Sequence, residues 1–191
     1  LQLKSKGLRV LPAELGHMPR LGSLRVNAAI EEFPDCSQLT ELSGIDLDGN
    51  QLKAFPKGIC DLQDIYMIRI SNNPIHHLPD GLANLSRLRT LCIANTRIRT
   101  LPECLAKLHL STFDVSQTQL ENLPSTLSSL HIDCQDFCRF AEQIYRMKTL
   151  KKLSIANVDK DFQLSGQIGQ LSNLEELRIK CEIHREAPNR R

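Results

Sequence analysis

The feature that most constrains the fold of this chain is an internal repeat. The segment "LKAFPKGICDLQDIYMIRISNNPIHHLPDGLANLSRLRTLCIANTRIRTLP" falls into register with itself at a shift of 23 residues. One apolar position can be followed along the sequence at spacings of 23, 21, 23, 23, 22, 17, 23 and 24 residues. It is occupied by Leu1, Leu24, Ile45, Ile68, Leu91, Phe113, Leu130, Leu153 and Leu177. Nine such units, the outer two incomplete, are expected to stack, because one small unit cannot bury its apolar face alone.

Each unit contains a short alternation of apolar and polar residues, such as Leu91, Cys92 and Ile93. Successive side chains of a β-strand point to opposite faces, so the two apolar residues share one face and the residue between them points the other way. The pattern predicts an α/β solenoid in which every unit adds one strand to a parallel sheet. The Leu-Pro or Phe-Pro pair in most units predicts a turn, because proline fixes φ.

Four segments carry a family resemblance: "LPAELGHMPRL", "FPKGICDLQDI", "LPDGLANLSRL" and "LPECLAKLHL". They resemble the LP-x-x-L-x-x-L segment of leucine-rich repeat proteins of the roughly 23-residue type. The resemblance implies a horseshoe with a parallel sheet on the concave face and short helices or 3₁₀ turns on the convex face. It also implies that residues 1–191 form a single leucine-rich repeat domain, which we expect to be part of a longer protein.

The sequence departs from the family pattern in two ways. The asparagine that joins neighbouring units by bonding buried backbone groups is present at Asn50 and Asn73, whereas Thr96 and Thr118 replace it in the next two units. The unit beginning at Phe113 is only 17 residues long, and "FAEQIYRMKTL" after it spaces apolar residues at helical intervals. We therefore expect an α-helix at about 139–149 and a local irregularity in the curvature beside it.

Charge and cysteine content limit the classes of partner and the compartment. The net charge is +2, and no run of apolar residues is long enough to span a bilayer, so neither nucleic acid nor a membrane is an expected partner. Seven cysteines, an odd number without C-x-x-C spacing, favour free thiols in a reducing compartment. We expect a cytoplasmic location, which would be the host cytoplasm for a secreted bacterial effector.

The stretch "HIDCQDFC" at 131–138 is the densest group of reactive side chains. In the register of the repeat, His131 and Asp133 project from the concave face, whereas Cys134 lies in a turn and Cys138 begins the helix. We interpret the first two as surface residues and the thiols as small buried hydrophobes. Two alternatives remain: a metal site of His131, Asp133 and Asp114, and a reactive thiol at Cys134 or Cys138.

No combination of residues typical of catalysis is present. The sequence lacks a glycine-rich phosphate loop and the H-E-x-x-H and G-x-S-x-G motifs. We therefore expect no enzyme activity within this segment, no cofactor, no resident metal and no small-molecule substrate. The "CQD" within 134–136 also matches the C-x-D motif of some bacterial ubiquitin ligases, but in that family the motif belongs to a separate helical domain.

The concave face is the expected binding surface, because nine strands about 4.8 Å apart form a wall roughly 40 Å long, suited to a protein or an extended peptide. Its charges should form alternating basic and acidic patches, and Cys92 should be the exposed thiol. The residues predicted to bind a protein are Arg25, Asp46, Asp48, Tyr66, Arg69, Cys92, Asp114, His131, Asp133, Arg178 and Lys180.

These observations favour a protein-recognition module without enzyme activity. Two biological settings resemble the sequence: the target-recognition domain of a bacterial effector, for example a ubiquitin ligase whose catalytic domain lies outside this segment, and a cytosolic eukaryotic scaffold or sensor. A function of another class, an enzyme or metal site around His131 and Asp133, is the alternative. The repeat type does not decide the partner or the oligomeric state.

Overall fold

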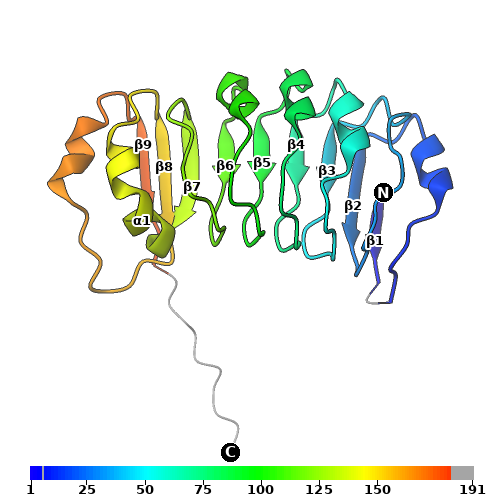
Figure 1. Cartoon of the computed structure of the whole chain (residues 1–191), viewed down its shortest axis with the longest axis horizontal. Helices are drawn as coiled ribbons and strands as arrows, with labels where there is room; N and C mark the ends of the chain where they lie inside the picture. Colours follow the sequence, from blue (N-terminus) through cyan, green and yellow to red (C-terminus); the bar gives the residue numbers. More distant parts are fainter. Residues whose placement is uncertain (6, 182–191) are drawn as a thin grey trace, which may run out of the picture.

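The structure, a computed structural model, describes residues 1–5 and 7–181, and in these residues the chain forms nine parallel strands in one sheet. Their order in the sheet is their order in the sequence, so that neighbouring units lie side by side from one end of the molecule to the other (Figure 1). The strands are β1 (Gln2–Lys4), β2 (Ser23–Asn27), β3 (Gly44–Asp46), β4 (Met67–Arg69), β5 (Thr90–Cys92), β6 (Thr112–Asp114), β7 (Ser129–Asp133), β8 (Lys152–Ala156) and β9 (Glu176–Ile179). The predicted solenoid of parallel strands is confirmed.

The register of the sheet agrees with the repeat, because the repeated apolar residues pair with one another on neighbouring strands. Leu24 pairs with Ile45, Ile45 with Ile68, and the series continues through Leu91 to Phe113. At β6 and β7 the pairing narrows to Asp114 with His131, whereas other neighbouring strands pair over at least three residues. The short unit therefore coincides with reduced pairing of these two strands, and the irregularity expected in the curvature stays a prediction.

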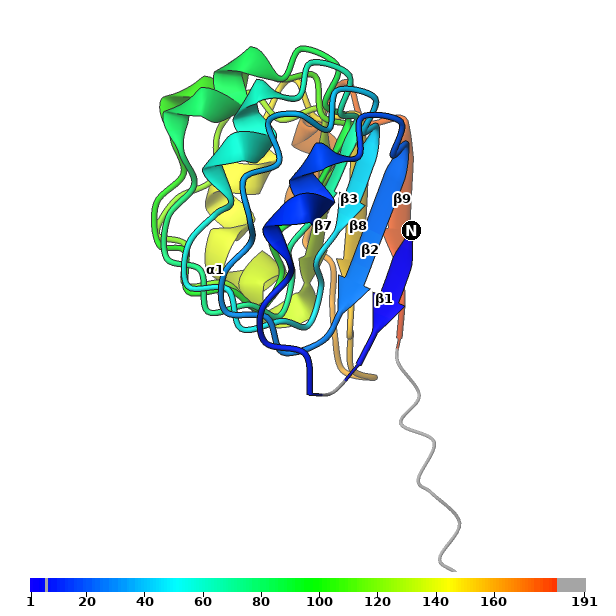
Figure 2. The same cartoon turned by 90° about the vertical axis from the view of Figure 1, so that its right-hand side faces the viewer.

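The sheet and the helices form two layers, seen along the stack in Figure 2, and the apolar core lies between them. From β2 to β8, the two inward positions of each unit are at most 1% exposed. Close packing of Leu, Ile, Val and Phe on both sides of each unit therefore holds the stack together. The equivalent positions of β9, Leu177 and Ile179, are 39% and 44% exposed, because the described residues place no further unit against them.

Short 3₁₀ helices on the far side of the core return the chain to the sheet. They are η1 (Ala13–His17), η2 (Lys57–Asp61), η3 (Asp80–Asn84), η4 (Glu103–Lys107) and η5 (Gly166–Gln170). The first four follow Pro12, Pro56, Pro79 and Pro102, whose φ angles lie between −64° and −79°. The short unit has a turn in place of a helix, so Pro124 begins none.

One α-helix, α1 (Cys134–Tyr145), follows β7 directly, five residues earlier than the predicted start at about 139. Asp133 ends the strand and caps the helix, because its Oδ1 accepts a hydrogen bond of 2.8 Å from the N–H of Asp136. The placement of Cys134 in a turn was therefore wrong. The helix also ends before the predicted residue 149. Met147 follows it in a turn, where its N–H donates to the carbonyl of Ile144 and its side chain is buried.

Candidate protein-binding face

The face of the sheet turned away from the helices is called the concave face below. Three columns of side chains cross it, one residue per strand in each column. The middle column, confirmed by the strand register, consists of Gln2, Arg25, Asp46, Arg69, Cys92, Asp114, His131, Ser154 and Arg178. Asp48, Asp133 and Lys180 belong to the column beyond the second core position, and Tyr66 precedes β4 at the edge of the face.

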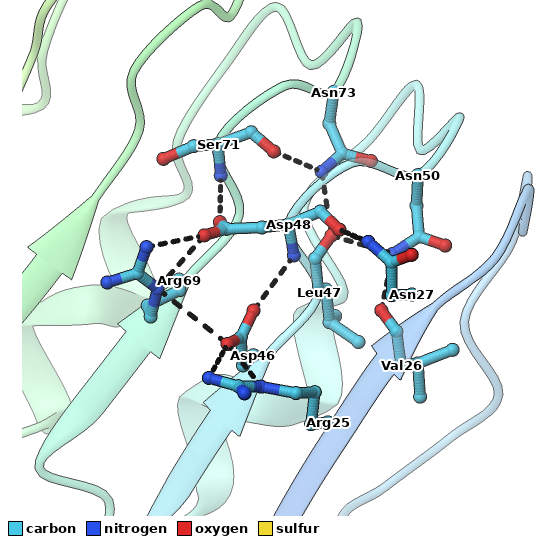
Figure 3. A network of polar contacts seen from close by, with 10 residues as sticks. All are labelled: Arg25, Val26, Asn27, Asp46, Leu47, Asp48, Asn50, Arg69, Ser71 and Asn73. Carbon is cyan, nitrogen blue, oxygen red and sulfur yellow. Dashed lines mark hydrogen bonds and ion pairs between the residues drawn. The ribbon is translucent and has the colours of Figure 1, made fainter. Parts of the chain in front are cut away.

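Two arginines and two aspartates form one network across β2, β3 and β4 (Figure 3). Arg25 donates to Oδ2 of Asp46 from Nε at 2.8 Å, and its Nη2 lies 2.7 Å from the same oxygen. Arg69 contacts Oδ2 of Asp48 from Nε at 2.9 Å and from Nη2 at 2.8 Å. A weaker contact of 3.7 Å between Nε of Arg69 and Oδ2 of Asp46 joins the two pairs.

The aspartates of this network are more buried than the arginines. The side chains of Asp46 and Asp48 are 11% and 21% exposed, against 55% for Arg25 and 41% for Arg69. Oδ1 of Asp48 also accepts the backbone N–H of Ser71 at 2.7 Å. Solvent therefore meets guanidinium groups rather than carboxylates here, and the acidic patch expected at Asp46 and Asp48 is neutralised by its neighbours.

Burial and ion pairing shift the pKa values of Asp48 and Arg69 in opposite directions. Burial disfavours the charged carboxylate and raises the pKa of Asp48, although the hydrogen bond and charge of Arg69 oppose this effect. Burial also disfavours the charged form of Arg69, but hydrogen bonds and charge from Asp48 raise its pKa overall. Ion pairs with half-exposed partners contribute only about 0–1 kcal/mol to stability. The network thus serves mainly to fix the orientation of the guanidinium groups.

Cys92 lies beside this network, and its predicted exposure was wrong. The side chain is 4% exposed, because it is short and lies between Arg69 and Asp114, its register partners on the neighbouring strands. Burial raises the pKa of the Cys92 thiol to about 12, so the group is neutral at physiological pH. Cys92 therefore contributes little contact surface.

The carboxylate of Asp133 is not on the binding surface. It is 5% exposed and caps α1, whereas His131 two residues earlier remains partly exposed. The strand ends where the helix begins, and so the side chain turns to the helix N-terminus. A metal site of His131, Asp133 and Asp114 would need that same carboxylate. In the part of the chain that the structure describes, no three His, Cys, Asp or Glu residues are grouped to hold a metal ion.

The cysteines of 131–138 are more accessible than expected. Cys134 is partly exposed although it packs against the apolar core, and Cys138 is exposed, whereas Phe137 is buried in the core. Burial, followed by the neighbouring Cys138, raises the pKa of the Cys134 thiol to about 11. A thiol that remains protonated is a weak nucleophile, which argues against a reactive Cys134.

The C-terminal third of the concave face brings three of the predicted residues together. His131, Arg178 and Lys180 line a hollow of about 250 Å³ over β6 to β9. Lys152 and Glu176, which also line it, were missed because sequence reasoning did not count the column before the first core position as outward-facing. The strand alternation itself carried that signal, since residues two apart share a face.

A family model described as a leucine-rich repeat region matches residues 76–190, which is more than half of the chain. The chain belongs to the leucine-rich repeat family. Among curated protein sequences, none matches this leucine-rich repeat chain. None of the helices in residues 1–5 and 7–181 is long and apolar enough to cross a lipid bilayer.

Solved structures share the fold at low sequence identity. A leucine-rich repeat protein of Leptospira interrogans is 24% identical, with a TM-score of 0.71 over 94% of this chain and 48% of that one. The internalin inlF of Listeria monocytogenes is 20% identical, with a TM-score of 0.57 over 91% of this chain and 60% of that one. Internalin C2 of the same species is 19% identical, with a TM-score of 0.52 over 84% of this chain and 81% of that one. The chain thus spans about half the length of the Leptospira protein.

Proposed function

We propose that this leucine-rich repeat chain is a protein-binding module whose partner contacts the concave face at β2 to β4. The observation that carries the proposal is the pair of arginines, Arg25 and Arg69, held in place by aspartates beneath them while their guanidinium groups stay exposed. A side chain that is already ordered loses less conformational entropy on binding. Arginine is also among the residues that most often dominate binding energy at protein interfaces.

Tyr66 supports the same location. It is half exposed at the edge of β4, next to the half-buried Met67. Tyrosine offers a large, rigid surface and a hydroxyl group, which makes it another frequent anchor of interfaces. Aromatic, thioether and guanidinium groups at β2 and β4 thus provide the mixed chemistry that is typical of the centre of a protein–protein contact.

The setting in which this module acts is a further part of the proposal. All seven cysteines are free thiols in the structure, which suits a reducing compartment such as the cytoplasm. Recognition of a host target by a secreted bacterial protein and scaffolding in a eukaryotic cytosol both require the same binding surface. Identification of the captured partner distinguishes the two settings.

Binding measurements on two variants test the contact surface. Proteins captured by the wild-type chain are identified and purified, and their affinities are measured by calorimetry. The double variant Arg25→Gln, Arg69→Gln and the single variant Tyr66→Ala should each weaken binding by about 2 kcal/mol or more. Tyr66→Ala leaves the aspartates paired, so its effect cannot come from unpaired carboxylates.

Arg87→Gln is the matched control. Arg87 also forms an exposed ion pair, with 2.6 Å from Nη1 to Oδ1 of Asp64, but it lies in the loop after η3 and outside the concave columns. Its replacement should change affinity by no more than about 0.5 kcal/mol. A partner that is lost with Arg87→Gln and retained by both concave variants would contradict the proposed surface.

A further inference from the structure

The hollow over β6 to β9 includes the junction at which β6 and β7 pair only through Asp114 and His131. At the junctions from β3 to β6 and from β7 to β9, two consecutive N–H groups donate to one carbonyl of the preceding unit, as Lys151 and Lys152 do to Ser128. At the β6–β7 junction the Ser128 hydroxyl instead donates to the carbonyl of Leu110, at 2.7 Å. This change occurs at the unit of 17 residues, the shortest of the repeat.

Small polar side chains and three cations line the hollow. Lys152, Arg178 and Lys180 supply the positive charges, and Glu176 supplies one negative charge. Hydroxyl-bearing side chains on neighbouring strands complete the wall, from Ser111, Thr112, Ser129 and Ser154.

Glu176 orients two of the cations. Its Oε1 lies 2.5 Å from Nε of Arg178, and its Oε2 lies 3.6 Å from Nζ of Lys152. The arginines over β2 to β4 are balanced by two aspartates, whereas the hollow keeps an excess of positive charge. Asp114 stands on the adjacent strand, but its Oδ1 is already bonded by the N–H and hydroxyl of Ser116, at 3.1 and 2.8 Å.

We propose that this hollow binds carboxylate side chains from an acidic segment of the protein that occupies the concave face, an inference that rests on the proposed function. Lysine, arginine and hydroxyl groups are the donors that a carboxylate needs. A volume of about 250 Å³ lies below the range of about 300–1,000 Å³ typical of small-molecule pockets, so one or two side chains fit better than a free ligand.

The hollow favours carboxylates over phosphate groups. Phosphate recognition commonly uses clusters of arginines with free guanidinium forks. Here Arg178 is the one arginine among the lining residues, and Glu176 already occupies its Nε. That carboxylate would also repel a doubly charged phosphate more strongly than a singly charged side chain.

A peptide titration tests the inference. The ¹⁵N-labelled protein is titrated with a capped hexaglutamate peptide, and backbone amide shifts are followed by NMR. Saturable shifts should concentrate at β7, β8 and β9, and a capped hexalysine peptide should produce none. The double variant Arg178→Glu, Lys180→Glu should weaken hexaglutamate binding by at least about tenfold. Lys180→Ala alone should weaken it less and keeps the test valid if the double variant unfolds.

Lys107→Glu with Lys160→Glu is the control, since both lysines are exposed outside the hollow and the change in net charge is the same. This variant should bind hexaglutamate within about twofold of wild type. Equal weakening in both double variants, or shifts centred on β2 to β4, would overturn the inference, as would tighter binding of a matched phosphoserine peptide. If hexaglutamate fails to bind while Tyr66→Ala still weakens partner binding, the inference falls and the proposed function stands.

Discussion

Two asparagines hold neighbouring units together with contacts that their threonine replacements cannot make. Nδ2 of Asn73 donates to the carbonyls of Leu47 and Ile70, at 2.9 and 3.0 Å, and Oδ1 accepts the N–H of Leu52 at 3.0 Å. Thr96 makes one side-chain hydrogen bond, of 2.7 Å, to Ile93 in its own unit. Of these two side chains, only that of Asn73 therefore bonds to the preceding unit.

Replacement of these residues should show that difference in stability. Asn73→Ala leaves several buried backbone groups unpaired and should cost about 3 kcal/mol, whereas Thr96→Ala should cost about 1 kcal/mol. Urea unfolding of both variants and the wild type measures the two losses. Equal losses would mean that bonds between units contribute no more than bonds within one.

The thiols should divide by exposure when the native protein is treated with a maleimide. Cys138 and Cys181 are exposed and should react first, whereas Cys36, Cys60 and Cys92 are buried and should react only on unfolding. Burial raises the pKa of Cys36 and Cys92 to about 12 and of Cys60 to about 11, above the ordinary value of 9. Mass spectrometry of quenched samples identifies the labelled positions, and early modification of Cys92 would contradict its burial.

The same shifts predict a loss of stability in alkali. Between pH 9 and about 11–12 the folded state keeps protons on these thiols that the unfolded state releases, so the free energy of unfolding falls as pH rises through this window. The stabilising effect is complete below pH 9. The urea midpoint of the wild type should therefore be lower at pH 10.5 than at pH 8. The midpoint of Cys92→Ala should fall by less over the same change in pH.

At the scale of elements, α1 depends on its N-cap residue, Asp133, which lies where a turn was expected. Asp133→Ala should cost about 1–2 kcal/mol, because the N–H of Asp136 loses its acceptor. Asp133→Asn should retain or increase stability, since asparagine is also a good cap and relieves the repulsion by which Asp133 helps to raise the pKa of Asp136. Urea unfolding compares the two with Asp161→Ala, an exposed control; a stable Asp133→Ala would mean that the cap is dispensable.

Sequence periodicity predicted elements better than their boundaries. Each strand was found because a parallel stack repeats one spacing, and an error in one unit would disturb the core on both sides. The start of α1 was missed because the family template places a turn after every strand, whereas this helix begins directly after the last residue of β7. The predicted helix was likewise too long, because Met147 continues the apolar spacing although it lies in a turn, where it is buried.

At the scale of the whole molecule, the sequence placed the concave columns but not their exposure. The register showed that Asp46, Cys92 and Asp133 follow core residues, yet all three are buried. Their burial depends on contacts with neighbouring strands and with α1, which a single strand's alternation does not contain. Neutralisation of Asp46 and Asp48 has the same origin, because the arginines that pair with them lie about 21 residues away in sequence.

Site-specific photo-crosslinking tests most directly whether the partner lies on the concave face. A benzophenone amino acid replaces Tyr66 in one variant and Lys107, on the helical side, in another; both positions are exposed. Irradiation with the captured partner should give a covalent adduct from position 66 and none from position 107. Adducts from position 107 without any from position 66 would place the partner on the helical side and contradict the account.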